Sequence, residues 1–315
     1  MRGVDVATTV RGVAIVAAAI VAVYASGQSR APESFARPSH ADARPSHADA
    51  QAFPSAFPRV MYTYWHDPDA VPDTVRECMA SWTRHNPGFR VVLLHPGNAA
   101  RYAPDLERLM KHPQFSDMLQ RTSDLVRACV LARHGGYWVD ASVFMRGPLS
   151  AWLFRGAPPD VEFAGFYIDK HTSRRPGASP TIENWFFGCA AGSPFARMWR
   201  DEFLRLADYE SVDAYVESLR AAGVDFSGVD WPKYLTQHLA ALAVLKDYDH
   251  GGRVHLHRAD DSAFKYLVDG GWEPEPALRR ECALPTHERV SFIKFRGPER
   301  GVLERDPDLR RCVLA

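Results

Sequence analysis

Four polar side chains near the middle of the chain have types and spacings that suit phosphate or sugar chemistry. Asp124 and Arg127 lie three residues apart on one face of a predicted helix that ends at a Gly-Gly pair. Asp140 and Ser142 follow at the end of a short predicted strand. Hard divalent cations are usually held by one or two carboxylates together with substrate phosphates. The same pattern also suits a helix-surface ion pair and an aspartate that starts a turn, so the spacing alone leaves both interpretations open.

The elements that would position these residues alternate between strands and helices. In the first half of the domain, strands are predicted at 59–64, 90–95 and 137–140, and helices at 72–86, 99–110 and 116–134. Further on, strands are predicted at 161–168, 254–257 and 291–295, and helices at 194–207, 212–222 and 234–245. This alternation predicts an α/β fold with a mainly parallel central sheet. Ligands bind beyond the carboxyl ends of such strands, which would place 64–67 and 140–142 at one rim.

The composition is that of an ordinary globular protein. The chain has 315 residues, 46% of them hydrophobic, and 38 basic side chains balance 38 acidic ones. Collagen, coiled coil and wholesale disorder are therefore excluded. A formal net charge of zero counts against nucleic acid as a partner, because binding to phosphates needs a basic surplus.

The first 26 residues predict a targeting segment. Residues 12–25 form an uncharged apolar run, shorter than the roughly 20 residues that cross a bilayer. A signal anchor that extends upstream, a cleaved signal peptide and a transit peptide or soluble leader all remain open. The first of these predicts a single-pass type II membrane protein, with its catalytic domain in the Golgi lumen or on the extracytoplasmic side.

Residues 27–56 predict a disordered stalk, and residues 57–315 a single catalytic domain. The stalk is rich in Pro, Ala, Ser and His and contains ARPSHAD twice in tandem, at 36–42 and 43–49. Such a segment cannot bury enough apolar surface to offset the entropy of ordering it.

The cysteines give a weak signal. Five cysteines are too few and too scattered for a disulfide scaffold, and no CxxC pair suggests zinc. A disulfide between Cys282 and Cys312 and a pair of reduced thiols are both compatible with the sequence.

Several ordered motifs resemble those of one known family. Residues 123–149, SDLVRACVLARHGGYWVDASVFMRGPL, resemble the core of the capsular polysaccharide synthesis family. That family belongs with the DxD sugar-binding glycosyltransferases, which include relatives of the α-mannosyltransferases of family 32. Residues 57–94 resemble the family's opening strand and its SW…HNP helix end. Downstream, ENWF at 183–186, GSPF at 192–195 and Trp199 resemble a further segment.

The resemblance implies a GT-A-like, Rossmann-like fold and transfer of a sugar from a nucleoside-diphosphate-sugar donor to a glycan acceptor, with retention of the anomeric configuration. Asp140-Ala141-Ser142 stands at the DxD position, where a serine replaces the second carboxylate. The resemblance therefore implies Mn²⁺ or Mg²⁺ at Asp140 and Ser142. A third ligand would have to come from elsewhere, and His255, His257 and His287 are candidates.

The resemblance also implies roles for individual residues. Asp140 would act in catalysis through the cation, and Asp124 and Arg127 would hold the hydroxyl groups of the donor sugar. Tyr64 and Trp65, at the end of the first strand, would stack on the nucleobase, although two core aromatic residues would look the same.

Two later segments complete the candidate site. Glu183 is the expected catalytic or acceptor-positioning carboxylate, with Asn184 beside it in donor binding, although either side chain could instead cap a helix. Lys294 and Arg296 could neutralise phosphates or form an ordinary solvated pair.

A non-catalytic binding protein and a hydrolase are the two alternatives to a glycosyltransferase. The missing second carboxylate favours a catalytically weak or inactive carbohydrate-binding or regulatory protein on the same fold. A secreted α/β hydrolase has no support, because the sequence contains neither a G-x-S-x-G elbow nor an HExxH helix.

Overall fold

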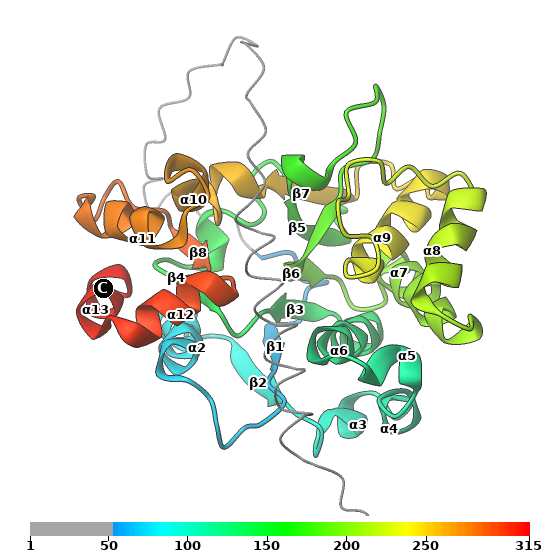
Figure 1. Cartoon of the computed structure of the whole chain (residues 1–315), viewed down its shortest axis with the longest axis horizontal. Helices are drawn as coiled ribbons and strands as arrows, with labels where there is room; N and C mark the ends of the chain where they lie inside the picture. The colour runs from blue at the N-terminus through cyan, green and yellow to red at the C-terminus, as the bar shows by residue number, and fades with distance from the viewer. Residues whose placement is uncertain (1–52) are drawn as a thin grey trace, which may run out of the picture.

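The computed structural model describes residues 53–315, which form a sheet with helices packed on both faces (Figure 1). The strands are β1 (Val60–Tyr64), β2 (Arg90–Leu94), β3 (Gly136–Val139), β4 (Val143–Met145), β5 (Phe163–Tyr167), β6 (Ile182–Cys189), β7 (Val254–Arg258) and β8 (Phe292–Lys294). The helices are α2 (Asp73–His85), α3 (Ala99–Tyr102), α4 (Leu106–Leu109), α5 (Pro113–Ser116), α6 (Leu119–His134), α7 (Pro194–Leu204), α8 (Val212–Ala221), α9 (Thr236–Asp247), α10 (Lys265–Asp269), α11 (Pro274–Ala283), α12 (Gly297–Arg305) and α13 (Pro307–Val313).

The central sheet has six strands in the order β2-β1-β3-β6-β5-β7. Strand β6 runs antiparallel to its neighbours β3 and β5, and the other three pairings are parallel. The predicted α/β class with a mainly parallel central sheet is confirmed. Because β6 runs the opposite way, its first residues lie at the edge where β1 and β3 end.

A second, two-stranded sheet brings a late segment to that edge. Strands β4 and β8 pair antiparallel, with Val143 opposite Lys294. The N–H of Phe295 also donates to the carbonyl of Ser142 at 3.0 Å. This long-range pairing places Lys294 next to Asp140 and Ser142, although about 150 residues separate them in the sequence.

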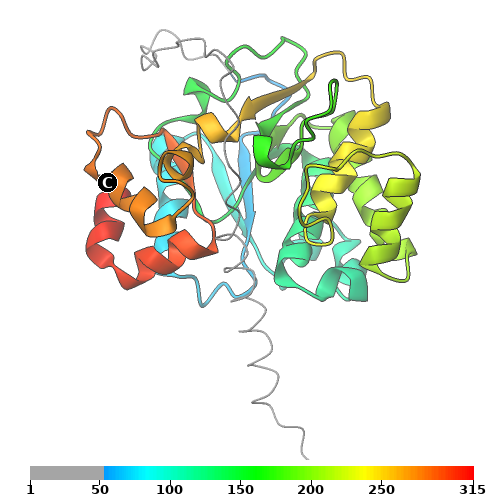
Figure 2. The same ribbon diagram turned by 45° about the horizontal axis from the view of Figure 1, so that its top comes forward.

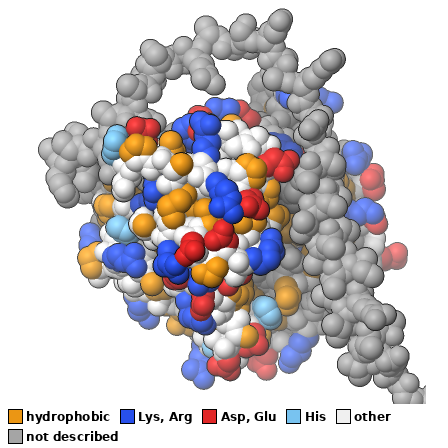
Figure 3. All heavy atoms as spheres, turned by 60° about the vertical axis from the view of Figure 1, so that its left-hand side comes forward, with side chains coloured by type: hydrophobic (Ala, Val, Ile, Leu, Met, Phe, Trp, Pro, Cys, Tyr) orange, Lys and Arg blue, Asp and Glu red, His pale blue; other side chains and the backbone are white. Residues whose placement is uncertain are grey.

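Helices cover both faces of the central sheet. Figures 1 and 2 show α2 and the C-terminal helices α10–α13 on one side, and α5–α9 on the other. Each side has its own apolar core, one around Trp138, Phe187 and Trp199, and the other around Trp82, Phe166 and Trp185. The surface that carries the C-terminal helices mixes acidic and basic side chains without a large region of one sign, in keeping with the zero net charge (Figure 3).

The packed domain begins upstream of the predicted boundary at residue 57. The ring of Phe53 makes edge contacts with Phe89, Tyr137 and Phe154, at centroid distances of 5.1–6.2 Å. Residues 53–56, predicted as the end of the stalk, therefore belong to the domain. The rest of the stalk and the predicted targeting segment at 1–26 lie outside the described residues. Within 53–315, no helix is long and apolar enough to cross a membrane.

The glycine pair between α6 and β3 is required by backbone geometry. Gly135 and Gly136 have φ values of 66° and 91°, in the left-handed region that side chains with a Cβ disfavour. A Cβ on Gly135 would lie 2.6 Å from the backbone nitrogen of Ala191, and one on Gly136 would lie 2.8 Å from the carbonyl oxygen of Val60. These two glycines let the chain turn from the buried helix directly into the strand that ends at Asp140.

Of the two states left open for Cys282 and Cys312, the structure has the disulfide. It joins the end of α11 to α13, with Cα atoms 5.6 Å apart. Cys78, Cys129 and Cys189 are buried free thiols, and burial raises the pKa of each.

Most predicted elements are present, with three differences. The helix predicted at 99–110 is divided into α3 and α4, whereas the one predicted at 116–134 is α6, with the short α5 just before it. Glu183 and Asn184 lie on β6, which was not predicted, so neither of them caps a helix. The short strand β4 and the helices α10–α13 were also not predicted.

Candidate active site

The candidate site is a cavity of about 580 Å³ at the carboxyl ends of β1 and β3. Its size is typical of pockets that bind small molecules. Ten of the predicted site residues line it: Tyr64, Trp65, Asp124, Arg127, Asp140, Ser142, Glu183, Asn184, Lys294 and Arg296. The histidines offered as metal ligands, His255, His257 and His287, do not. The prediction that the ends of the first and third strands share one rim is confirmed.

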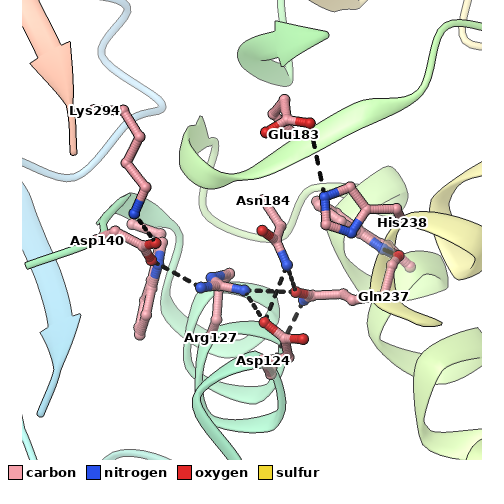
Figure 4. Close-up of polar contacts among 10 residues, drawn as sticks. Asp124, Arg127, Asp140, Glu183, Asn184, Gln237, His238 and Lys294 are labelled. Carbon is pink, nitrogen blue, oxygen red and sulfur yellow. Dashed lines mark hydrogen bonds and ion pairs between the residues drawn. The ribbon is translucent and has the colours of Figure 1, made fainter. Parts of the chain in front are cut away.

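A hydrogen-bonded network fixes the floor of the cavity (Figure 4). The guanidinium of Arg127 pairs with the carboxylate of Asp124, and its Nη1 also donates to Gln237 Oε1 at 2.7 Å. Asn184 Nδ2 donates to the same two acceptors, at 3.0 Å to Asp124 and 2.8 Å to Gln237. Because each of these groups is held by at least two others, the network is preorganised before any ligand arrives.

Asp140 connects this network to the opposite wall. Its Oδ1 accepts from Arg127 Nη2 and from the indole of Trp138, both at 2.8 Å, and its Oδ2 accepts from Lys294 Nζ at 2.6 Å. Burial alone would raise the pKa of Asp140, but the Lys294 ammonium and the Arg127 guanidinium lower it to about 2. Asp140 is therefore ionised at physiological pH and lies between two cationic groups.

The predicted metal site does not have the donors that a divalent cation needs. Both oxygens of Asp140 accept from cationic or N–H donors, and Ser142 Oγ accepts from Lys294 Nζ at 2.9 Å. Within residues 53–315, no group of three or more Asp, Glu, His or Cys side chains could hold a metal ion. His255 and His257 instead contact the backbone carbonyls of Arg155 and Leu153, away from the cavity. The residues at Asp140 and Ser142 thus do not fit Mn²⁺ or Mg²⁺.

Glu183 faces a different environment on β6. Burial raises the pKa of its carboxyl group to about 7, within the range where a general base is most effective. The imidazole of His238, on α9, lies 3.9 Å from this carboxyl group, and burial lowers its pKa to about 3. His238 is therefore neutral near pH 7 and leaves Glu183 free to change charge there.

An irregularity in the sheet lies at this end of β6. The register between β5 and β6 shifts from Gly165 opposite Phe187 to Phe166 opposite Glu183, so three β6 residues have no partner on β5. The carbonyl of Trp185, inside this bulge, accepts from the N–H of Asp140 at 2.8 Å. Bulges often lie beside active sites because they redirect side chains.

The aromatic pair at the end of β1, Tyr64 and Trp65, was expected either to stack on a nucleobase or to pack in the core, and the structure has features of both. Tyr64 is buried in the core and also lines the cavity, and burial raises its pKa to about 12. Trp65 lines the cavity with Arg300 over its ring, at 5.9 Å from the centroid. Its indole N–H is buried and has no hydrogen-bond partner within residues 53–315.

Sequence reasoning missed several residues of this cavity. Gln237 and His238 lie on an otherwise apolar helix, where two buried polar side chains in succession are a usable signal. Trp272 has a positive φ of 65°, and Lys170 and Arg296 lie over its ring. Its N–H donates to the carbonyl of Leu267 at 2.7 Å, so Trp272 closes the turn that follows α10.

Part of the chain is similar in sequence to a curated glycosyltransferase. The chain is 27% identical over 162 residues to the O-glycosyltransferase braB of Annulohypoxylon truncatum. The alignment covers 47% of this chain and 37% of that protein, so the chain spans well under half of the relative's length.

Two solved structures have a weak likeness to the chain. Mouse xyloside xylosyltransferase 1 is 9% identical with a TM-score of 0.42, and covers 76% of this chain and 98% of its own. A glycosyltransferase involved in glycosylation of the major capsid of PBCV-1 is 10% identical with a TM-score of 0.36, and covers 79% and 98%.

The family profile described as capsular polysaccharide synthesis protein matches residues 42–216, more than half of the chain. This match spans Asp124, Asp140, the Gly-Gly pair and Glu183. The chain belongs to the capsular polysaccharide synthesis protein family.

Proposed function

We propose that the protein is a glycosyltransferase that moves a sugar from a nucleoside-diphosphate-sugar donor to a hydroxyl group of a glycan acceptor. The observation that carries this proposal is the combination, in one cavity, of an ionised Asp140 held by two cations and a Glu183 whose pKa is about 7. The first arrangement suits a charged diphosphate, and the second suits proton transfer from a hydroxyl group.

The remaining residues of the cavity have roles in this proposal. Asp124 and Asn184 offer carboxylate and amide oxygens to the hydroxyl groups of the donor sugar, with Arg127 holding Asp124 and Gln237 holding Asn184. Trp65 offers its ring to the base. Glu183 accepts the proton of the attacking hydroxyl group. The GT-A-like classification and retention of configuration are proposed from the family resemblance.

A screen of nucleotide sugars tests the proposal directly. Full-length protein incubated with single nucleotide sugars and a panel of oligosaccharide acceptors should release the nucleoside diphosphate from one donor and add one sugar mass to an acceptor. Mass spectrometry measures both products, and proton NMR of the new glycosidic bond reads the configuration. The Glu183→Gln variant is the matched control. Donor binding in calorimetry without release from any donor would instead support the carbohydrate-binding alternative.

We further propose that the catalytic domain lies in the Golgi lumen or on the extracytoplasmic side, held by a membrane anchor within residues 1–26. The disulfide between Cys282 and Cys312 supports this location, because disulfides persist mainly in oxidising compartments. Protein isolated with thiols blocked should give a cross-linked peptide pair containing both cysteines, and should resist carbonate extraction from membranes. Alkylation of both Cys282 and Cys312 would contradict the proposed oxidising compartment. Release of the protein from membranes by carbonate would contradict the membrane anchor.

A further inference from the structure

The ammonium group of Lys294 lies where the resemblance to DxD glycosyltransferases places a divalent cation. Lys294 Nζ donates to Asp140 Oδ2 at 2.6 Å and to Ser142 Oγ at 2.9 Å, the two residues predicted as metal ligands (Figure 4). An ammonium group has three N–H donors. Within residues 53–315, two of them have acceptors, and Lys294 lines the cavity, so one N–H is available for a ligand oxygen.

We propose that Lys294 replaces the divalent cation and neutralises the leaving diphosphate, so that sugar transfer needs no metal. This inference rests on the proposed function and assigns the group that stabilises its leaving group. Arg300 lines the same cavity and adds positive charge near Lys294, whereas the guanidinium of Arg296 is already paired with Glu299. A diphosphate there would meet an ammonium and a guanidinium group, which bind phosphate oxygens well.

The backbone holds Lys294 in this position from two sides. Lys294 lies opposite Val143 in the β4–β8 pair, and the next residue, Phe295, donates its N–H to Ser142. On the other side, the hydroxyl of Tyr266 donates to the carbonyl of Lys294 at 3.0 Å. A group that is fixed before the reaction stabilises developing charge without the cost of reorganisation.

The electrostatics of Asp140 agree with this assignment. The ammonium of Lys294 and the carboxylate of Asp140 form a partly buried ion pair at 2.6 Å. Asp140 thus serves as the counter-ion of Lys294 and Arg127, with one oxygen to each cation. In a metal site, the same carboxylate would need its oxygens for the metal.

The transfer step balances without a metal. The bond between C1 of the sugar and the β-phosphate oxygen breaks, and its electron pair stays on that oxygen, which gains a negative charge. Lys294 donates a hydrogen bond to this oxygen and keeps its proton. The acceptor oxygen forms the new bond to C1 on the face that the leaving oxygen vacates, as the proposed retention requires, and its proton passes to the carboxylate of Glu183.

Direct metal binding is the first test. Full-length protein is titrated with Mn²⁺ alone, and electron paramagnetic resonance measures the free ion. We expect that the wild-type protein does not bind one equivalent of Mn²⁺ at Asp140, so that wild type and Asp140→Asn leave the same amount of ion free. One equivalent of Mn²⁺ bound by the wild-type protein and lost in Asp140→Asn would overturn the inference.

Binding of inorganic pyrophosphate in EDTA, measured by calorimetry, is the second test. Wild-type protein should bind it, and Lys294→Met should weaken binding about 10- to 100-fold, as expected for loss of a charged hydrogen bond. Lys294→Arg should keep most of the affinity. Lys265→Met, a matched control at an exposed lysine outside the cavity, should leave the affinity unchanged. Equal affinity in wild type and Lys294→Met, or binding only when Mn²⁺ is added, would overturn the inference.

The two proposals fail separately. Sugar transfer that requires Mn²⁺ would keep the proposed function and overturn the role of Lys294. Metal-free pyrophosphate binding that depends on Lys294, without transfer from any donor, would keep the anion site and overturn the proposed function. If Lys294→Met does not fold in circular dichroism, the Mn²⁺ titration of the wild-type protein still decides.

Discussion

Asp140→Asn is expected to lower kcat about 100- to 1000-fold, the usual effect of losing an electrostatic stabiliser of the transition state. The carboxylate accepts from Lys294 on one oxygen and from Arg127 on the other, and an amide cannot balance both cations. We expect Lys294 to lose its fixed position against the leaving diphosphate. Steady-state kinetics with the donor found in the screen, in EDTA, measures the effect.

Thermal unfolding provides a second readout of the same variant. The folded-state pKa of Asp140 is about 2, below its ordinary value, so its ionised form stabilises the fold above pH 4. This contribution is lost as the pH falls from about 4 to about 2. Wild-type protein should therefore melt at a higher temperature than Asp140→Asn at pH 6, and the difference should shrink towards pH 2.

Ser142→Ala separates the charge of Asp140 from general disturbance of the site. Ser142 accepts from the same ammonium group but carries no charge, so its loss should lower kcat less than about tenfold. Undiminished activity of Asp140→Asn, or equal losses in the two variants, would contradict the role given to Asp140.

The sequence predicted the first half of the domain well, because local patterns determine it. The alternation of strands and helices up to residue 140 indicated parallel β-α units, and the Gly-Gly pair marked the end of α6. The rim that joins Tyr64 to Asp140 follows from parallel strands alone. None of these inferences needs a contact between distant parts of the chain.

The second half depends on contacts that no local pattern encodes. Strand β6 reads as an apolar run with a polar start, and nothing in it says that it runs antiparallel between β3 and β5. Strand β4 has only three residues, too short for a periodic signal, and the strand predicted at 291–295, which contains β8, carries no sign of its partner. Their pairing nevertheless decides the chemistry, because it brings Lys294 to Asp140 and Ser142.

The metal prediction shows this limit at a single position. Asp140-Ala141-Ser142 contains one carboxylate and one hydroxyl group, and this pair predicts a divalent cation site. A sequence motif shows only ligands that are neighbours in the chain. Lys294 was proposed to neutralise phosphates, but its contact with both supposed ligands is a tertiary fact. The cation expected at this position is therefore better supplied by the chain itself, as proposed above.

Glu183→Gln is expected to lower kcat about 100- to 10,000-fold, the usual contribution of general base catalysis. Wild-type activity should rise with pH up to about 7, because the base must be ionised and its pKa is about 7. The variant should lose this acid limb, since glutamine does not titrate in this range. Measurement of kcat/KM from pH 5 to pH 9 for both proteins checks the prediction.

The same substitution should stabilise the protein, which distinguishes a catalytic role from a structural one. Burial raises the pKa of Glu183 from 4.5 to about 7, so the carboxyl group favours the fold only while it is protonated. That contribution is present below pH 4.5 and is lost as the pH rises through 7. Above pH 7, Glu183→Gln should therefore unfold with a free energy up to about 3 kcal/mol higher than wild type. At pH 4, the two proteins should differ little.

Activity and stability should thus move in opposite directions at pH 8. A side chain that only holds the fold together would lose both when altered, and one that only positions the acceptor would lower kcat and keep the acid limb near pH 7. An acid limb that persists in Glu183→Gln would assign the titration to another group and remove Glu183 as the base. A variant that loses activity and its pH dependence, but melts at a higher temperature than wild type, would leave proton transfer as the explanation. The reason is that the buried carboxylate destabilises the fold in the ionised form that catalysis requires.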